Sequence, residues 1–392
     1  MTFAEAVQWA VCLPAAFLLG WFALEVALGL RPLRRKGRAG GEVRFAVLIP
    51  AHDESAGIGE TVADVRRAAP AARILVVADN CADETASIAR AAGAEVVERF
   101  HATRRGKGYA LAFGRDHLSA NPPDAVVVLD ADCRIEPGGA AGIASLACAS
   151  GRPVQAANLV MGGEGAGPQV AISNFAMMVK NLFRARGMSR IGGSALLFGT
   201  GMAFPWRMFA ELPLATGDST EDLSLGLLLV RQGGAVVLAD HVRVTSPPPS
   251  LGASQGQRKR WEHGFLRNMA TQALPMIVTG ALRGSRRVMA IGLHMTVPPL
   301  ALLVFLSTAL LGACVLAAWF TGHWAPVIVL AAAFGLAAIA VVAAWLAGGR
   351  AVLSGGDLLH IPRYVIWKLP IYLAFFGRRQ TEWNRTDRGE SS

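Results

Sequence analysis

With 392 residues, 53% of them hydrophobic, and a mean hydropathy of +0.39, the chain can bury a full domain core and still have apolar sequence left for lipid. Its net charge of +10 comes from basic residues that concentrate beside hydrophobic segments, so it favours an anionic lipid surface and argues against nucleic acid as a partner. The five cysteines form no CxxC pair and have no His partner at zinc spacing, which argues against a zinc centre and favours reduced, structural thiols.

The first predicted element is an apolar helix over 7–30, interrupted by Pro14 and Glu25. At roughly 1.5 Å per residue, a helix of this length crosses a hydrocarbon core of about 30 Å. Residues 1–6 contain Glu5 and no Lys or Arg, so the segment predicts an uncleaved transmembrane helix and not a signal peptide. The basic flank that follows places the next domain on the cytoplasmic side. This flank consists of Arg31, Arg34, Arg35, Lys36 and Arg38.

From 42 to 250, short β-branched runs alternate with Ala-rich helical stretches. This alternation predicts a doubly wound, Rossmann-like α/β domain with a mostly parallel sheet. Buried strands are expected at 45–49, 74–78, 95–97 and 126–129, and helices at 57–69, 84–92 and 107–118.

Acidic residues follow three of these strands: Asp53 and Glu54 the first, Asp79 the second, and Asp130 with Asp132 the fourth. Ligands of such open sheets bind beyond the carboxyl ends of the strands. Helix capping or turn formation would explain any one of these positions. Three acidic positions at successive strand ends favour a shared ligand site.

Asp130 and Asp132 are separated by the small Ala131, so in an extended stretch their side chains would point the same way. Two carboxylates so placed can hold Mg²⁺ or Mn²⁺, with phosphate oxygens completing the coordination shell. An Asp-x-Asp pair is common by chance, and its place directly after a strand raises its significance.

Glu221 and Asp222 begin a helical stretch over 223–230. A helix N-terminus stabilises an ionised carboxylate, which suits a general base. An ordinary helix cap with acidic first-turn residues is the alternative interpretation.

The sequence Gln257-Arg258-Lys259-Arg260-Trp261 opens a predicted amphipathic helix, on which Trp261, Phe265 and Met269 recur at i+4 spacing and form one apolar face. Such a helix fits a lid that closes over a diphosphate, and it equally fits an interfacial helix that binds lipid head groups. The glycine-rich piece at 198–203 follows an apolar stretch interpreted as a strand, and it would let a sugar approach the backbone or form an ordinary turn.

Two more transmembrane helices are predicted, at 288–320, which contains Pro298 and Pro299, and at 325–346. Residues 359–376 mix prolines, charges and aromatic residues, which favours an interfacial position, and the tail with Arg378 and Arg379 returns to the cytoplasm. The expected organisation is a span and basic flank (1–41), a catalytic domain (42–250), an interfacial helix (251–287), two spans (288–347), and an interfacial helix with a tail (348–392).

Several motifs together resemble the nucleotide-sugar-binding half of family 2 glycosyltransferases. They are Ile49-Pro50-Ala51-His52-Asp53-Glu54, Asp79-Asn80-Cys81-Ala82-Asp83-Glu84-Thr85, Gly106-Lys107-Gly108-Tyr109-Ala110-Leu111 and Asp130-Ala131-Asp132. Thr220-Glu221-Asp222 and 257–261 resemble the acceptor-side motifs of the membrane-bound branch, which includes cellulose, chitin and hyaluronan synthases and ceramide glucosyltransferase. The resemblance covers roughly 44–265.

The resemblance implies a GT-A fold, a UDP-sugar donor and an inverting transfer that depends on Mg²⁺ or Mn²⁺. Its implied site residues each have a role in this sequence. Glu54 and Asp79 would contact the uridine, Lys107 and Asp130 the nucleotide, Asp132 (with Asp130) the metal, Gln257 and Arg260 the diphosphate, Trp261, Gly199, Thr200 and Gly201 the acceptor, and Asp222, beside Glu221, would be the general base.

Three predicted spans are too few to line a polymer channel in one subunit. We therefore expect transfer of one sugar onto a lipid-linked or membrane-embedded acceptor, by a multi-pass protein of the bacterial inner membrane. A processive polysaccharide synthase acting on a glycan, as an oligomer or with a partner subunit, is the second interpretation. A membrane protein that binds a nucleotide sugar without turnover is an alternative from another class, and a nucleotidyltransferase is the least favoured.

Overall fold

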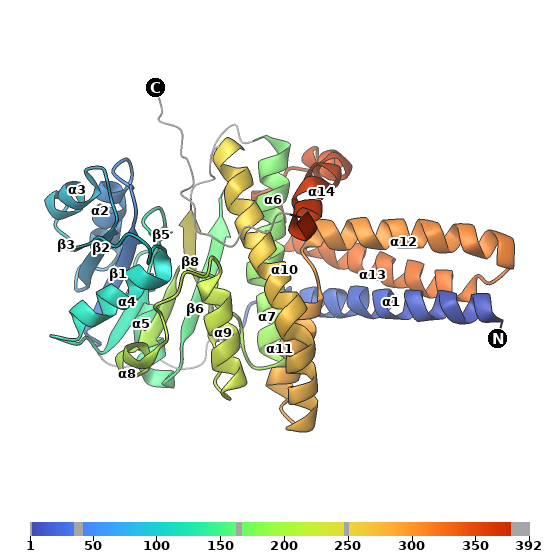
Figure 1. Ribbon diagram of the computed structural model, residues 1–392, viewed down its shortest axis with the longest axis horizontal. Helices are drawn as coiled ribbons and strands as arrows, with labels where there is room; N and C mark the ends of the chain where they lie inside the picture. The colour runs from blue at the N-terminus through green and yellow to red at the C-terminus, as the bar shows by residue number, and fades with distance from the viewer. Residues whose placement is uncertain (1, 35–41, 162–166, 247–250, 378–392) are drawn as a thin grey trace. The chain divides into compact units, whose positions relative to one another are not determined.

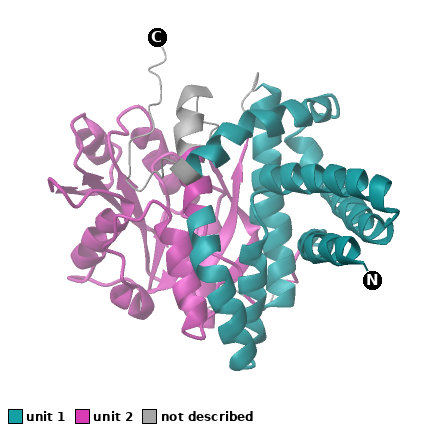
Figure 2. Ribbon diagram, turned by 45° about the vertical axis from the view of Figure 1, so that its right-hand side comes forward, with its two compact units in different colours: residues 1–31, 164–192, 266–379 teal, residues 32–163, 193–265, 380–392 magenta. Residues whose placement is uncertain are grey.

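The computed structural model describes residues 2–34, 42–161, 167–246 and 251–377 (Figure 1). Its contacts divide the chain into two compact units (Figure 2). Among the described residues, the sheet unit lies within Pro32–Gly163 and Gly193–Phe265, and the helical unit lies within Met1–Arg31, Glu164–Gly192 and Leu266–Arg379. Residues 164–192 therefore lie inside the catalytic segment in sequence and belong to the helical unit in space, which the sequence pattern did not indicate.

The described part of the sheet unit is built on one sheet in the order β3-β2-β1-β4-β7-β6-β8-β5. β1 pairs in parallel with β2 and β4, whereas β7 runs antiparallel to both β4 and β6. The strands are β1 (Phe45–Ala51), β2 (Arg73–Asp79), β3 (Glu95–Arg99), β4 (Ala125–Val128), β5 (Arg134–Ile135), β6 (Val154–Val160), β7 (Met202–Pro205) and β8 (Val237–Ser246).

Helices cover both faces of this sheet. α2 (Ile58–Ala68), α3 (Thr85–Ala91) and α5 (Gly139–Ser150) share an apolar core with alternate strand residues such as Val47 and Ile49. α4 (Lys107–Leu118) lies on the other face, where a Cβ on Gly114 would come within 2.5 Å of Leu48, so glycine is needed for this close approach. Short α8 (Trp206–Glu211) and α9 (Glu221–Arg231) complete the unit.

The strands predicted at 45–49, 74–78 and 126–129 and the helices predicted at 57–69, 84–92 and 107–118 are confirmed. The strand predicted at 95–97 forms as β3, but it lies at the sheet edge and is half-buried, not buried. An edge strand has one neighbour instead of two, so its side chains keep more exposed surface.

The described residues of the helical unit include three helices that are long and apolar enough to cross a membrane: α1 (Phe3–Gly29), α12 (Leu300–Thr321) and α13 (Ala325–Ala347). They lie alongside one another (Figure 1). The span predicted at 288–320 begins later than expected, because α11 (Arg286–Thr296) ends before Pro298 and Pro299. Proline lacks the amide hydrogen of a helix interior and disfavours helical geometry in the residue before it.

The remaining helical segments in the described part of the chain are not candidate spans. They are α6 (Pro168–Met178), the π-helix η1 (Val179–Arg184), α7 (Ala185–Ile191), α10 (Leu251–Leu282), the 3-10 turns η2 (Gly349–Ala351) and η3 (Asp357–His360), and α14 (Ile361–Gly377). The long α10 belongs to the sheet unit up to Phe265 and to the helical unit from Leu266.

Glu25, which the sequence showed only as an interruption of the first span, forms a buried charge cluster. Its carboxylate lies 2.7 Å from Nε of Arg184 and 2.9 Å from Nδ1 of His294, and it accepts a hydrogen bond from Nε1 of Trp21 at 2.8 Å. Close packing accompanies these contacts, since a Cβ on Gly187 would lie 1.9 Å from the Glu25 carbonyl oxygen. The cluster thus links α1 to residues more than 150 positions away in the sequence.

Replacing Arg184 with Met should lower the unfolding temperature of the purified chain in detergent. Removing one partner of a buried ion pair leaves the other charge uncompensated, at about 3–5 kcal/mol. The double variant Glu25→Gln/Arg184→Met should recover most of the loss, because it removes both charges. An Arg184→Met protein as stable as the wild type would contradict this account of the cluster.

Candidate active site

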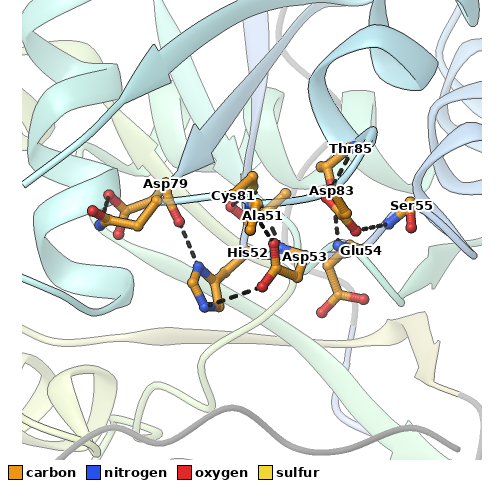
Figure 3. A network of polar contacts seen from close by, with 11 residues as sticks. Ala51, His52, Asp53, Glu54, Ser55, Asp79, Cys81, Asp83 and Thr85 are labelled. Atoms are coloured by element: carbon orange, nitrogen blue, oxygen red, sulfur yellow. Dashed lines mark hydrogen bonds and ion pairs between the residues drawn. The ribbon is translucent and has the colours of Figure 1, made fainter.

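Two loops at the carboxyl ends of β1 and β2 are joined by hydrogen bonds (Figure 3). Asp53 has a positive φ of 52°, and its Oδ1 accepts a hydrogen bond from the amide of Ala82 at 2.7 Å. The amide of Glu54 donates to Oγ1 of Thr85 at 2.7 Å. Asp is one of the residue types that adopt this left-handed backbone conformation most readily, and its bond to Ala82 joins the two loops. Asp53 therefore shapes the loop that carries Glu54.

Asp83 fixes the same pair of loops. Burial alone would raise the pKa of its carboxyl group, but hydrogen bonds from Thr85 and Ser55 outweigh burial and lower the pKa to about 2. One of these bonds joins the Ser55 amide to Oδ2 of Asp83 at 3.0 Å. The ionised carboxylate is thus part of the scaffold around Glu54.

Asp79 ends β2 and is buried against a cation that the sequence analysis did not identify. Its Oδ1 lies 2.5 Å from Nη1 of Arg99 and accepts a hydrogen bond from the Asn80 side chain at 2.9 Å. Arg99 also lies over the ring of Tyr109, 5.5 Å from its centroid. The position of Asp79 at the ligand edge of the sheet agrees with the sequence, and its pairing with Arg99 was not foreseeable because their separation depends on strand pairing.

Asp130 and Asp132 lie in a turn after β4 and not in the extended stretch that the sequence predicted. The Cys133 amide donates to the Asp130 carbonyl at 3.0 Å, which closes this turn. One oxygen of each carboxylate and the Cys133 sulfur nevertheless lie within 4.8 Å of one another. The two carboxylates converge through the turn and do not rely on strand alternation.

The donor atoms at this turn fit a hard divalent cation. Burial, together with the charges of Asp132 and Asp130, raises the pKa of the Cys133 thiol well above its usual value. A protonated thiol is a poor metal ligand, so the carboxylate oxygens remain, and oxygen ligands suit Mg²⁺ or Mn²⁺.

Lys107 connects the Asp130 turn to the glycine loop. Its Nζ forms an ion pair with Asp130 and donates to the Gly199 carbonyl at 2.6 Å. Burial lowers the pKa of Lys107, but the charges of Asp130, Glu221 and Asp222 outweigh burial and raise the pKa above its ordinary value. The side chain is therefore a stable cation among carboxylates.

Glu221 and Asp222 begin α9, as expected. Asp218, which the sequence analysis did not single out, accepts from the Thr220 amide at 3.0 Å and from Oγ of Ser224 at 2.7 Å, and so holds the first turn. Gly199 has a φ of +83°, and a Cβ there would lie 3.2 Å from Oδ2 of Asp222. The glycine loop and Asp222 therefore face each other closely.

Burial, followed by the charge of Asp222, raises the pKa of Glu221 to about 8 against the attraction of Lys107. An apolar pocket adjoins the two carboxyl groups and is lined by Leu111, Val128, Phe204 and Leu225. Such surroundings disfavour a second negative charge beside Asp222. The raised pKa favours the protonated form of Glu221.

α10 approaches the start of α9 at Gly264, where a Cβ would lie 2.2 Å from Cγ2 of Thr220. One turn earlier, Arg260 is influenced by the charge of Glu221, although burial lowers the pKa of Arg260 overall. Trp261 and Phe265 lie one turn apart on this continuous helix, and their burial differs, because Trp261 is 39% exposed while Phe265 is 6% exposed. The side chain of Gln257 lies outside the described residues, and the helix begins at Leu251, six residues before the motif.

The loop with Gly199, Thr200 and Gly201 does not follow a strand. Ala195 forms a single bridge with Val236, and the strand β7 comes after the loop. Gln155 on β6 holds this loop through hydrogen bonds to Phe198 and Thr200. Asn158 on the same strand also donates to the Phe198 carbonyl at 3.1 Å. Polar residues within an apolar strand were the local signal for this role, since buried polar groups need partners.

Glu221→Gln should change how stability depends on pH. Because the folded-state pKa of about 8 lies above the ordinary carboxyl value of 4.5, the stabilising contribution of Glu221 is fully present at low pH and is lost as the pH rises through about 8. The unfolding temperature of the Gln variant should therefore fall less than that of the wild type between about pH 6 and about pH 9.

Thermal melts across this range measure the effect, and Glu211→Gln on the exposed surface of α8 is the matched control. Parallel pH profiles for the wild type and Glu221→Gln would contradict the raised pKa.

Comparison with known proteins identifies the family and the fold of the chain. Residues 43–264 match a family model described as glycosyltransferase like family 2. The structure of the mannosyltransferase PcManGT from Pyrobaculum calidifontis, in complex with GDP-Man and Mn²⁺, covers 96% of this chain and 99% of its own, with 18% identity and a TM-score of 0.56. This likeness shows the shared GT-A fold, and the α/β fold expected from the sequence is confirmed.

A second solved structure is glucosyl-3-phosphoglycerate synthase from Mycobacterium tuberculosis with Mn²⁺, UDP and glucosyl-3-phosphoglycerate. It covers 59% of this chain and 86% of its own, with 20% identity and a TM-score of 0.40. No curated protein sequence matches the chain.

Proposed function

We propose that this chain, a member of the glycosyltransferase like family 2, is a membrane-bound inverting enzyme. It would move a sugar from a nucleoside-diphosphate donor to the hydroxyl group of a lipid-linked or membrane-embedded acceptor. One observation carries the proposal. In the sheet unit, Lys107 bonds to Asp130 and to Gly199, while Gly199 lies against Asp222. These contacts support one site that holds both Asp130, a candidate metal ligand, and Asp222, the candidate base.

The donor would bind at the carboxyl ends of β1, β2 and β4. Glu54 follows β1 and Asp79 ends β2, where they suit the nucleoside, and Lys107 with Asp130 would also lie near the nucleotide. UDP is the nucleotide that the sequence motifs favour. GDP is the second candidate, since PcManGT was solved with GDP-Man.

Asp132 and Asp130 would hold Mg²⁺ or Mn²⁺, as their converging oxygens support. The ion, when bound, supplies positive charge that stabilises the departing diphosphate. Arg260, on α10 near Glu221, is the protein's own cation for the same charge. Lys107 bonds to both Asp130 and Gly199 and so holds the metal-binding turn beside the glycine loop.

Asp222 would take the proton of the acceptor hydroxyl, so that the oxygen attacks the anomeric carbon from the face opposite the diphosphate. The bond between that carbon and the phosphate oxygen breaks, and its electron pair leaves with the nucleotide. Protonated Glu221 does not compete as a base and lowers the negative charge around Asp222. The exposed ring of Trp261 and the bare backbone of Gly199 suit the acceptor.

The three apolar helices support a membrane location. On α10, Leu274, Val278 and Leu282 recur at i+4 spacing and are exposed, and the exposed Arg283 follows them. An apolar stripe beside a basic residue suits an anionic lipid interface. The small number of candidate spans favours single transfer over a processive synthase, and the length of the labelled product on a gel would separate the two.

Asp222→Asn should abolish transfer while keeping nucleotide affinity. The amide keeps the shape but cannot accept the proton, and loss of a general base lowers the rate by roughly 10²–10⁴-fold. Labelled sugar transfer to membrane lipid and calorimetric titration with UDP or GDP measure the two properties.

Asp116→Asn, an exposed carboxylate on α4, is the control and should behave as the wild type. A wild-type protein that binds nucleotide sugar but turns over no UDP- or GDP-sugar would support the non-catalytic alternative instead.

Asp132→Asn should weaken Mn²⁺ binding in the presence of nucleotide, because a neutral amide oxygen replaces a charged ligand. Electron paramagnetic resonance of free Mn²⁺ during titration measures this directly, without turnover. The same Asp116→Asn control applies. Unchanged Mn²⁺ affinity in Asp132→Asn would show that the metal does not bind at Asp132.

A further inference from the structure

Gln155 lies on β6 and is fully buried, and its side chain bonds to the backbone of the loop before β7. β6 pairs with β7 at Val154 and Gln155, opposite Ala203 and Met202, and one further backbone bond joins the Ala156 amide to the Gly201 carbonyl at 2.8 Å. The Gln155 side chain then bonds to the residues before Gly201. Oε1 accepts from the Phe198 amide at 2.8 Å, and Nε2 donates to the Thr200 carbonyl at 2.8 Å.

Both the oxygen and the nitrogen of the Gln155 side-chain amide form hydrogen bonds. Nε2 also donates to the Ala156 carbonyl at 2.9 Å, so each of its two hydrogens has an acceptor. A carboxylate at position 155 would face two carbonyl oxygens with no hydrogen to donate. A methionine of similar length would leave the Phe198 amide and the Thr200 carbonyl without these bonds. The site therefore requires glutamine's particular arrangement of donor and acceptor.

The loop that Gln155 holds, residues 198–200, contacts three parts of the candidate active site. The Gly199 carbonyl accepts from Lys107, and Oγ1 of Thr200 accepts from the Asp130 amide at 3.1 Å. The α-carbon side of Gly199 lies against Asp222. A shift of this loop would therefore change the distance between the metal-binding turn and the base.

We infer that Gln155 is a positioning residue for the sugar transfer: its side-chain amide fixes the 198–200 loop and thereby sets Asp222 and the acceptor relative to Asp130. The inference rests on the proposed function for its reaction, and on the hydrogen bonds of Gln155 for the loop itself. Gln155 contacts the loop backbone and acts on the reacting groups only through that loop.

The test compares the full-length wild type with Gln155→Met and Val154→Ala in detergent. Val154 is a buried neighbour on the same strand that belongs to the apolar core, so its truncation controls for lost stability. Hydrogen exchange of a peptide covering 196–201 reports the Phe198 amide directly. Calorimetry with UDP or GDP and Mn²⁺ reports donor binding, and transfer of labelled sugar to membrane lipid reports kcat and the KM for donor.

Gln155→Met should speed exchange at Phe198 and lower kcat by about 10²-fold, since a misplacement of about 1 Å has that effect, while the nucleotide Kd and the donor KM stay within about twofold. Val154→Ala should leave exchange at Phe198, the nucleotide Kd and kcat close to the wild-type values. Equal exchange in Gln155→Met and Val154→Ala overturns the inference, as does a parallel loss of nucleotide affinity and kcat. A wild type that transfers no sugar instead disproves the proposed function, and the exchange result still decides whether Gln155 fixes the loop.

Discussion

The ion pair between Lys107 and Asp130 is the contact on which the candidate active site depends. Asp130, Asp132, Glu221 and Asp222 bring four carboxyl groups to one region of the sheet unit, and like charges in a partly buried site repel one another. Two features reduce that repulsion. Lys107 contributes a positive charge, because these neighbours raise the pKa of its ammonium group. The raised pKa of Glu221 favours its protonated, neutral form.

This electrostatic arrangement requires glycine where backbone and side chains crowd together. Lys107 donates to the Gly199 carbonyl. The same glycine lies against Asp222, where a Cβ would come within 3.2 Å of Oδ2. Gly264 plays the same role where α10 meets Thr220. Motif residues such as Arg260 therefore reach the site only because nearby glycines let the backbones approach.

The helical unit shows the same physical rule in a different setting. Glu25 is compatible with an apolar helix because Arg184 and His294 come to it from other segments. A buried charge is kept only with partners, whether in a catalytic cluster or in a packed bundle. Residues 164–192 carry Arg184, so this insertion in the catalytic segment gives the first apolar helix its cation.

The sequence by itself determined the local elements and the positions of the acidic residues at their ends. Strand periodicity predicted 45–49, 74–78 and 126–129, and the order of motifs from Asp53 to Asp222 predicted the family. Only the tertiary structure decided the partners: Arg99 for Asp79, Gln155 for the loop at Gly199, and the turn that brings Asp132 to Asp130. Local patterns encode which face of a strand or helix is buried, whereas a hydrogen-bond partner far away in sequence depends on strand order and packing, which no short window of residues contains.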